Sequence, residues 1–237
     1  MSLFYTPDIS GNIYQLNEEE SKHCIRVLRL AVGSEVHLTD GQGTLYTTRI
    51  TDAHPKACCV DVVHREENFG RHPYFLHLAV APTKNMERYE WMLEKITEIG
   101  VDIITPVLCE HSERRVFKQE RAEKIVISAM KQSLKTRLPK LQDLTDIKQF
   151  IRQPFDGKKY ICHCAKDERL LLPQALKGCS KALILIGPEG DFSPEEITLA
   201  LQHGFKPVSL GDTRLRVETA ALVACTYMQA VQLLNKI

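Results

Sequence analysis

The stretch Leu183-Ile-Leu-Ile-Gly-Pro-Glu-Gly190 and the residues after it decide the fold of this chain. Its first four residues form a short apolar run that stops at Gly-Pro, which is typical of a strand buried in an α/β sheet. A helix is predicted to begin directly afterwards, because Ser193 can cap it, Pro194 suits its first turn and Glu196 completes a capping box. Residues 187–191 therefore form a strand-to-helix loop, and ligands of α/β sheets bind at such loops.

The same arrangement occurs again a short way along the chain. Pro207-Val-Ser-Leu210 is predicted to be a short strand, residues 211–216 a loop that contains Arg214 and Arg216, and Val217 the start of an alanine-rich helix. Either loop alone is consistent with an ordinary turn between a strand and a helix. The two loops together, each with glycine at a strand end, indicate one ligand-binding cleft.

Strand and helix patterns alternate from Tyr74 onwards. This alternation predicts an α/β domain over 73–237, with a mostly parallel sheet covered on both faces. Residues 141–158 show no clear pattern. The predicted strands are 74–80, 102–108, 160–164, 183–186 and 207–210, and the predicted helices are 87–99, 120–133, one after Ser193 and one over 217–234.

Strand patterns dominate the first 70 residues, which we expect to form a separate, small, mostly-β domain. Asp40-Gly-Gln-Gly43 is a hairpin signal between predicted strands 35–39 and 44–50, and 57–63 is a third strand. A helix over 18–30 is predicted to carry His23, Arg26 and Arg29 on its surface. A β domain with a few surface charges is the alternative to a nucleic-acid-binding domain.

Composition excludes few functions. The net charge is +1, so the chain has no global nucleic-acid signature. Nine Lys or Arg residues nevertheless lie between Glu113 and Lys140, opposed by only three acids, which indicates either a solvated helix face or a phosphate-contacting surface. No leader pattern is present, and no apolar stretch approaches the ~20 residues of a membrane span, so we expect a cytoplasmic protein. The absence of G-x-G-x-x-G argues against a Rossmann-type cofactor site.

The eight cysteines form no Cys-x-x-Cys pair. Cys162-His163-Cys164 is their only cluster and falls in a predicted strand, where Cys162 and Cys164 would share one face. A zinc site there lacks a second ligand pair. We therefore predict free, buried thiols and no metal.

Three motifs of the second half are specific: Gly187-Pro-Glu-Gly190, Leu210-Gly211, and Leu215-Arg216 with Glu218-Thr-Ala220. Together they resemble one known family, the SPOUT class of RNA methyltransferases, and within it the RsmE type, which methylates N3 of a uridine in 16S ribosomal RNA. Weaker resemblance is found at Lys84 to Val101, Glu110 with Ser112, Gln132-Ser133 with Arg137-Leu-Pro139, and His23 with Val27-Leu-Arg29. The sequence departs from the family pattern at His111 and Lys135 (usually Arg), Asp191 (usually Gly), Thr213 (usually Arg) and Arg214 (usually a large aliphatic residue).

The resemblance implies a PUA-like RNA-binding barrel over 1–70 and a SPOUT domain with a trefoil knot over 73–237. It also implies S-adenosyl-L-methionine as cofactor, a homodimer, and 16S ribosomal RNA in the small ribosomal subunit as partner. The expected cofactor-binding residues are Leu108, Glu110, Ile186, Gly187, Pro188, Glu189, Gly190, Leu210, Gly211 and Leu215. The expected RNA-binding residues, by resemblance and by charge, are His23, Arg26, Arg29, Lys84, Arg114, Lys135 and Arg137.

The implied chemistry is transfer of a methyl group to a ring nitrogen whose proton is mostly retained at neutral pH. An ordinary carboxylate is a poor base for that proton, since each unit of pKa mismatch costs about 1.4 kcal/mol. We therefore expect an arginine to stabilise the developing uracil anion, with Arg216 the first candidate and Arg214 the second. Glu218 either orients the arginine, accepts the proton, or is simply an acid at a helix N-terminus.

Two other functions fit the same residues. Another SPOUT enzyme, acting on ribose 2'-hydroxyls or on transfer RNA, would share the cofactor loops and differ in product. A non-catalytic RNA-binding or ribosome-assembly factor would keep the fold without binding the cofactor.

Overall fold

The computed structural model describes residues 2–164 and 169–234. Contacts divide the chain into two compact units, one formed by the residues up to Arg71 with Ile127–Leu138, the other by His72–Val126 with the residues from Pro139. The sequence pattern had assigned residues 127–138 to the second domain. Helix α3 (Gln119–Gln132) thus begins in one unit and ends in the other.

The first unit is built on a five-stranded sheet in the order β1-β3-β4-β5-β2. Strands β1 and β3 pair in parallel and the others are antiparallel, and the predicted hairpin over Asp40–Gly43 connects β3 to β4. Leu16, Leu38, Ile50 and Val60 form the centre of its core. The strands are β1 (Leu3–Tyr5), β2 (Ile13–Gln15), β3 (Glu35–Thr39), β4 (Leu45–Asp52) and β5 (Cys59–Glu66).

The helix predicted over 18–30 is shorter than expected. It consists of α1 (Glu18–Lys22), capped by the Asn17 side chain, and a π-helical turn, η1 (His23–Val27). Arg29 adopts a left-handed backbone conformation (φ 56°), which a right-handed helix cannot contain. The helix therefore ends before the residue that was expected to belong to it.

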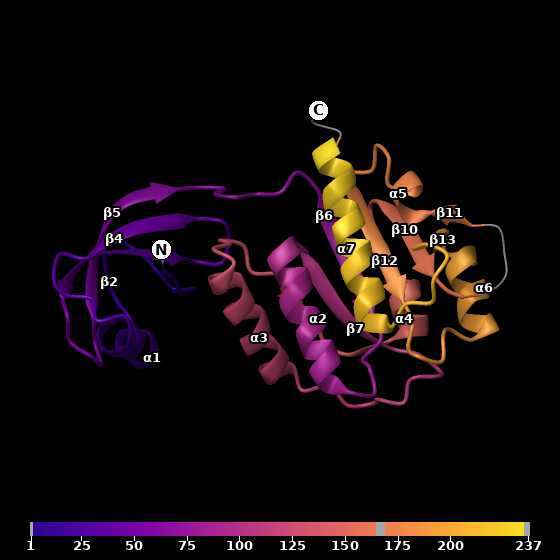
Figure 1. Cartoon of the computed structure of the whole chain (residues 1–237), viewed down its shortest axis with the longest axis horizontal. Coiled ribbons are helices and arrows are strands. Elements are labelled where there is room, and N and C mark those ends of the chain that lie inside the picture. Colours follow the sequence, from indigo (N-terminus) through magenta and orange to yellow (C-terminus); the bar gives the residue numbers. More distant parts are fainter. Residues whose placement is uncertain (1, 165–168, 235–237) are drawn as a thin grey trace. The chain divides into compact units, whose positions relative to one another are not determined.

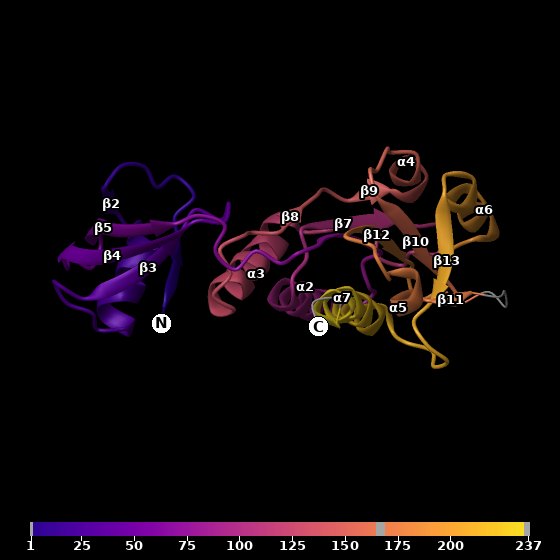
Figure 2. The same ribbon diagram turned by 90° about the horizontal axis from the view of Figure 1, so that it is seen from above.

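The second unit contains a sheet in the order β11-β13-β10-β12-β6-β7-β8, with β9 also paired to β7 (Figures 1 and 2). Its strand pairings are all parallel. The strands are β6 (Phe75–Val80), β7 (Ile103–Leu108), β8 (Lys140–Leu141), β9 (Thr145–Asp146), β10 (Lys158–Cys162), β11 (Leu170–Leu171), β12 (Lys181–Ile186) and β13 (Phe205–Ser209). The helices are α2 (Met86–Ile99), α4 (Ile147–Ile151), α5 (Leu172–Ala175), α6 (Pro194–Gln202) and α7 (Val217–Leu234).

Helices cover both faces of this sheet. Figure 2 shows α4 and α6 on one face and α2, α5 and α7 on the other. Strand β12 is apolar after Lys181 because both of its faces are covered. Leu183 and Leu185 pack in the cluster with Phe150 and Ala200 on the α4–α6 side, while Ile184 is buried at 0% exposure on the other side. The predicted α/β architecture with a parallel sheet is confirmed, whereas the trefoil knot stays a prediction.

No apolar stretch long enough to span a membrane was expected from the sequence, and helix α7 departs from that expectation. By length and composition alone it is apolar enough to cross a membrane. Ala221, Ala224 and Met228 are nevertheless completely buried, and the Gln229 side chain donates a hydrogen bond to the Ile99 carbonyl at the end of α2. Burial along one side and polar contacts with α2 are what a helix in a protein core shows.

Candidate functional site

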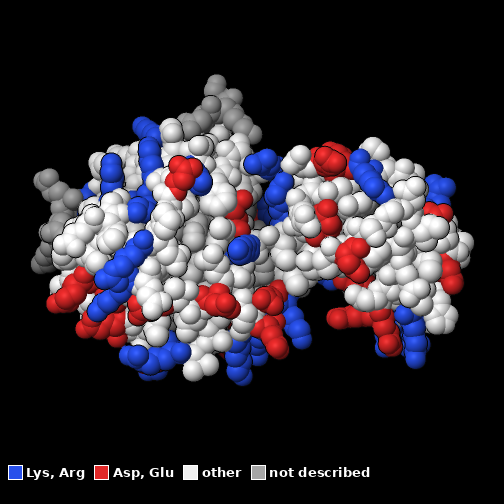
Figure 3. Space-filling view, turned by 180° about the vertical axis from the view of Figure 1, so that it is seen from behind, with Lys and Arg blue, Asp and Glu red and all other residues white. Residues whose placement is uncertain are grey.

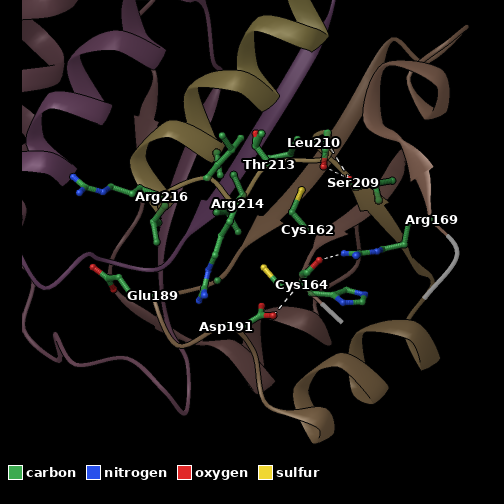
Figure 4. Close-up of a pocket in the computed structure, with 18 of the residues that line it drawn as sticks. Cys162, Cys164, Arg169, Glu189, Asp191, Ser209, Leu210, Thr213, Arg214 and Arg216 are labelled. Atoms are coloured by element: carbon green, nitrogen blue, oxygen red, sulfur yellow. Dashed lines mark hydrogen bonds between the residues drawn. The ribbon is translucent and has the colours of Figure 1, made fainter. Parts of the chain in front are cut away.

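A cavity of the second unit lies at the carboxyl ends of three neighbouring strands. Strand β10 pairs with both β12 and β13, so the three ends meet at one edge of the sheet. The cavity has a volume of about 730 Å³ and is shown in Figure 4. It is lined by residues 162–164 and Arg169, by 186–189 and Asp191, and by 208–217 and Ala220.

The first loop, residues 187–192, is fixed by a buried carboxylate at the start of α6. Glu196 is 1% exposed, and its Oε2 accepts a hydrogen bond from the Ser193 amide at 2.9 Å while the Ser193 hydroxyl accepts one from the Glu196 amide. This is the predicted capping box. The other carboxylate oxygen accepts a hydrogen bond from the amide of Glu110 at 2.8 Å, so the same side chain also holds the loop after β7.

Gly187, Gly190 and Gly211 are each required to be glycine, but for different physical reasons. A Cβ on Gly187 would lie 3.0 Å from the Phe192 ring, and one on Gly190 would lie 2.9 Å from the Cβ of His111. These two positions therefore exclude side chains because other side chains already fill the space. Gly211 has a φ of 137° with no atom within 4 Å of its Cβ position, so its backbone conformation is what requires glycine.

The second loop places two exposed arginines differently. In Figure 4 the Arg214 side chain extends into the space bounded by Glu189, Cys164 and Asp191, whereas the Arg216 guanidinium points away from it. The Arg216 carbonyl accepts a hydrogen bond from the Ala220 amide and thus belongs to the start of α7.

Glu218, the third residue expected in catalysis, does not line this cavity. It is 8% exposed, and its carboxylate lies 4.0 Å from Nε of Arg88 on α2. It is also in the first turn of α7, where an acid interacts favourably with the helix dipole.

The end of β10 is the part of the site that the sequence analysis missed. The strand ends at Cys162, so Cys164 lies beyond it rather than on the same strand face. The eight cysteines, all within the described residues, form no disulfide. Five are buried, as predicted, but Cys59 and Cys162 are half-buried and Cys164 is exposed, contrary to the prediction. Desolvation raises the pKa of the Cys162 thiol to about 12. The signal that could have found this segment was its place after an apolar strand, Tyr160-Ile-Cys162, the same feature that identified the other two loops.

Seven of the ten residues expected to bind a cofactor line the cavity: Ile186, Gly187, Pro188, Glu189, Leu210, Gly211 and Leu215. Leu108, Glu110 and Gly190 do not. Leu108 pairs with Asp146 of β9, the Glu110 amide bonds to Glu196, and Gly190 packs under His111. These three shape the loops next to the cavity.

The residues expected to contact RNA fall into separate groups. In the first unit His23, Arg26 and Arg29 are exposed, while Arg137 donates a hydrogen bond to the Asn68 side chain, and its guanidinium covers Gly43. Lys135 lies in the same unit and is half-buried.

Lys84 and Arg114 line a smaller pocket of about 420 Å³ in the second unit, together with Lys118 and Arg121. Acids neutralise part of this charge, since Lys84 lies 2.7 Å from Glu113. Basic and acidic side chains are likewise interspersed over the face seen in Figure 3.

A ligand cavity at the ends of adjacent parallel strands, with arginines and carboxylates in its lining, defines the second unit as a ligand-binding α/β domain. Comparison with known families identifies it further. Residues 70–229 match the RNA methyltransferase domain, and residues 16–63 match the RNA methyltransferase PUA domain. The chain therefore belongs to this family of RNA methyltransferases, as its motifs predicted.

Individual relatives match over nearly the whole chain. A crystal structure of a probable rRNA-methyltransferase from Porphyromonas gingivalis is 43% identical, with a TM-score of 0.91, covering 99% of this chain and 100% of that one. Ribosomal RNA small subunit methyltransferase E from Neisseria gonorrhoeae, solved bound to S-adenosyl methionine, is 27% identical, with a TM-score of 0.88 and 98% coverage of both chains. The protein of the same name from Synechocystis sp. is 30% identical over 213 residues, covering 87% of this chain and 69% of that protein.

Proposed function

We propose that this protein is an S-adenosyl-L-methionine-dependent methyltransferase that methylates N3 of a uridine in the 16S ribosomal RNA of the small subunit. Family membership and the names of its relatives support the reaction class and the ribosomal RNA substrate. The observation that carries the proposal is the cavity, which lies at the loops that contain the family motifs. The uridine N3 position rests on the RsmE-type motifs.

The cavity fits the proposed cofactor in size and in chemistry. A volume of about 730 Å³ lies within the usual range for small-molecule sites. Apolar strand-end residues such as Ile186 and Val208 suit an adenine ring, and Gly211 presents backbone with no side chain in the way. Three carboxylates, of Glu189, Asp191 and Asp212, offer partners for ribose hydroxyls, an amino group or a sulfonium. When bound, the cofactor supplies an electrophilic methyl group.

We propose that Arg214 stabilises the negative charge that develops on the uracil ring, with Arg216 as the second candidate. The direction of the two side chains supports this order, because Arg214 extends into the cavity and Arg216 points away (Figure 4). A positioned guanidinium stabilises a developing anion, and it does so more strongly once bound cofactor and RNA exclude water from the cavity. The family's arginine at position 213 is threonine here, so the cation is displaced by one residue.

The role of Glu218 is proposed to be structural support of this loop. Its burial and its position beside Arg88 favour a carboxylate that ties the start of α7 to α2. From there it orients the 214–216 loop without exchanging a proton with the substrate.

RNA binding is proposed to involve both parts of the chain, with residues 1–70 as the PUA-like RNA-binding domain and 73–237 as the SPOUT methyltransferase domain. The exposed His23, Arg26 and Arg29 and the basic pocket at Lys84 and Arg114 are the candidate phosphate contacts. Arg114→Ala is expected to lower the slope of log affinity against log salt by roughly 0.7 per lost contact. An unchanged slope would remove this pocket from the interface.

A homodimer in the cytoplasm is the proposed working form of the protein. The homodimer is implied by the family resemblance, and the cytoplasm is supported by the ribosomal RNA substrate for which the relatives are named. Sedimentation equilibrium at micromolar concentration gives the oligomeric state directly, and a monomer would contradict this part of the proposal.

Single-turnover methyl transfer to small ribosomal subunits tests the catalytic assignment. Arg214→Ala is expected to lower the rate of transfer by about 10²–10³-fold with little change in cofactor affinity, as for loss of one group that stabilises charge in a transition state. Arg152→Ala is the matched control. It removes an exposed arginine at the end of α4, which covers the sheet face opposite to that covered by α7. If Arg216→Ala is the slow variant and Arg214→Ala transfers at the wild-type rate, the two roles are reversed.

A further inference from the structure

We propose that Asp191 is a positioning residue that holds the segment Cys162–Cys164 in place as the third wall of the cofactor cavity. The inference rests on the proposed function, because it takes the cavity to be the cofactor site. Asp191 stands at a position where the family usually has glycine, and the segment Cys162–Cys164 lies outside the family motifs.

The Asp191 carboxylate joins two loops that are distant in sequence. Its Oδ2 accepts a hydrogen bond from the backbone amide of Cys164 at 2.8 Å, and its Oδ1 accepts one from the amide of Phe192 at 2.9 Å. The first bond reaches the chain just after the end of β10, and the second stays within the 187–192 loop. Figure 4 shows the carboxylate directed toward Cys164.

The backbone of Asp191 gives an independent reason to assign a role to its side chain. Its φ is 62°, in the left-handed region that glycine adopts without strain and other residues adopt at a cost. A glycine would therefore suit the backbone at this position better. The strained aspartate is explained if the two hydrogen bonds of its carboxylate offset the strain.

His111 completes the network from the other side of the loop. Its Nδ1 lies 3.0 Å from the carbonyl oxygen of Gly190 and 3.1 Å from that of Asp191, so this nitrogen carries the proton and donates it to both. The Cβ of His111 also fills the space that a side chain on residue 190 would need. His111 and Asp191 both depart from the family pattern, and they are in contact with each other.

The segment that Asp191 holds is central to the cavity. Because β10 lies between β12 and β13 in the sheet, the chain leaving β10 separates the two loops that contain the family motifs. Cys162, His163 and Cys164 all line the cavity. Movement of the Cys164 backbone would therefore change the shape of the site while leaving its motif residues intact.

The test compares Asp191→Gly and Asp191→Asn with the wild type in three measurements: hydrogen–deuterium exchange of cofactor-free protein in peptides covering Cys164, the Kd for S-adenosylhomocysteine by calorimetry, and the thermal midpoint. Asp191→Gly is expected to speed exchange at Cys164 and to raise the Kd by about tenfold, the equivalent of one hydrogen bond to a carboxylate. The thermal midpoint should stay close to wild type, because the glycine relieves backbone strain. Asp191→Asn, which keeps one acceptor oxygen, should give intermediate values.

Asp212→Asn is the charge control for the exchange measurement alone, because Asp212 is itself a candidate cofactor contact. It removes a carboxylate from the same cavity, and exchange at Cys164 should match wild type. The proposal is overturned if Asp191→Gly leaves the exchange of Cys164 unchanged, or if exchange rises while the Kd stays at the wild-type value. Failure of the wild type to bind S-adenosylhomocysteine would instead contradict the proposed function, and the exchange measurement would still decide whether Asp191 holds the segment.

Discussion

Replacing Glu196 by alanine should destabilise the second unit more than any change of an exposed acid. Its carboxylate accepts hydrogen bonds from two backbone amides, those of Ser193 and Glu110, at 2.9 and 2.8 Å, and the side chain is 1% exposed. A hydrogen bond to a charged group contributes about 1.5–3 kcal/mol, and the amides left behind lose their acceptors. We therefore expect a loss of about 3–5 kcal/mol in the free energy of unfolding.

Urea denaturation followed by circular dichroism measures this loss as a shift of the transition midpoint at an unchanged slope. Glu195→Ala is the matched control, because Glu195 lies in the same first turn of α6, is exposed, and carries the same charge. The free energy of unfolding lost in Glu195→Ala should stay below about 1 kcal/mol, the usual size of a helix-dipole effect at the surface. If Glu196→Ala and Glu195→Ala lower the free energy of unfolding equally, the Glu196 carboxylate does not hold the two loops.

Three further predictions concern packing, pH and thiol reactivity. Gly187→Ala places a methyl group 3.0 Å from the buried Phe192 ring, so thermal unfolding should show a loss of about 1–3 kcal/mol. Burial lowers the pKa of His77 to about 4, so the folded chain takes up this proton less readily than the unfolded chain. The contribution of neutral His77 to the free energy of unfolding is therefore fully present above the unfolded pKa of about 6.5 and falls by up to about 3 kcal/mol as the pH drops to 4. Urea titrations at several pH values should show this loss in the wild type and not in His77→Gln. Ellman's reagent should modify the exposed Cys164 before Cys162, whose raised pKa keeps its thiol protonated, and S-adenosylhomocysteine should slow that modification.

The parts of the fold that are determined by residues close to one another in the sequence could be predicted. The apolar run before Gly187 and the residues around Ser193 predicted a buried strand and a capped helix, and the structure contains both, with the capping box formed. Strand β3 was predicted with its observed bounds, Glu35–Thr39. In each case a strand period, a cap or a turn within a few residues determines the structure.

Features that depend on distant contacts were missed. Nothing in the sequence of β10 says that it lies between β12 and β13, because strand order in a parallel sheet is set by how the helices pack. The Cys162–Cys164 segment was therefore taken for buried thiols rather than for the wall of a cavity. The same applies to residues 127–138, which follow the helical pattern of the second domain but have their contacts in the first unit, where the Thr136 carbonyl accepts a hydrogen bond from Thr39.

The site itself was predicted in part. Motif resemblance found loops that line the cavity, and it ranked Arg216 ahead of Arg214. Both arginines line the cavity, and in Figure 4 the Arg214 side chain extends into it while the Arg216 guanidinium points away. Side-chain direction follows from the backbone of the loop, and the loop sequence alone does not determine it. The departures at Asp191 and His111 could be seen in the sequence, but their contact with each other could not.

The most direct test of the central claim is to identify the nucleoside that this protein methylates. Small ribosomal subunits from cells that lack the corresponding activity are incubated with the protein and labelled S-adenosylmethionine, and the digested RNA is analysed by chromatography and mass spectrometry. The account predicts N3-methyluridine in 16S ribosomal RNA, formed about 10²–10³-fold more slowly by Arg214→Ala. Label in a ribose-methylated nucleoside, or in a transfer RNA added as a competing substrate, would contradict it.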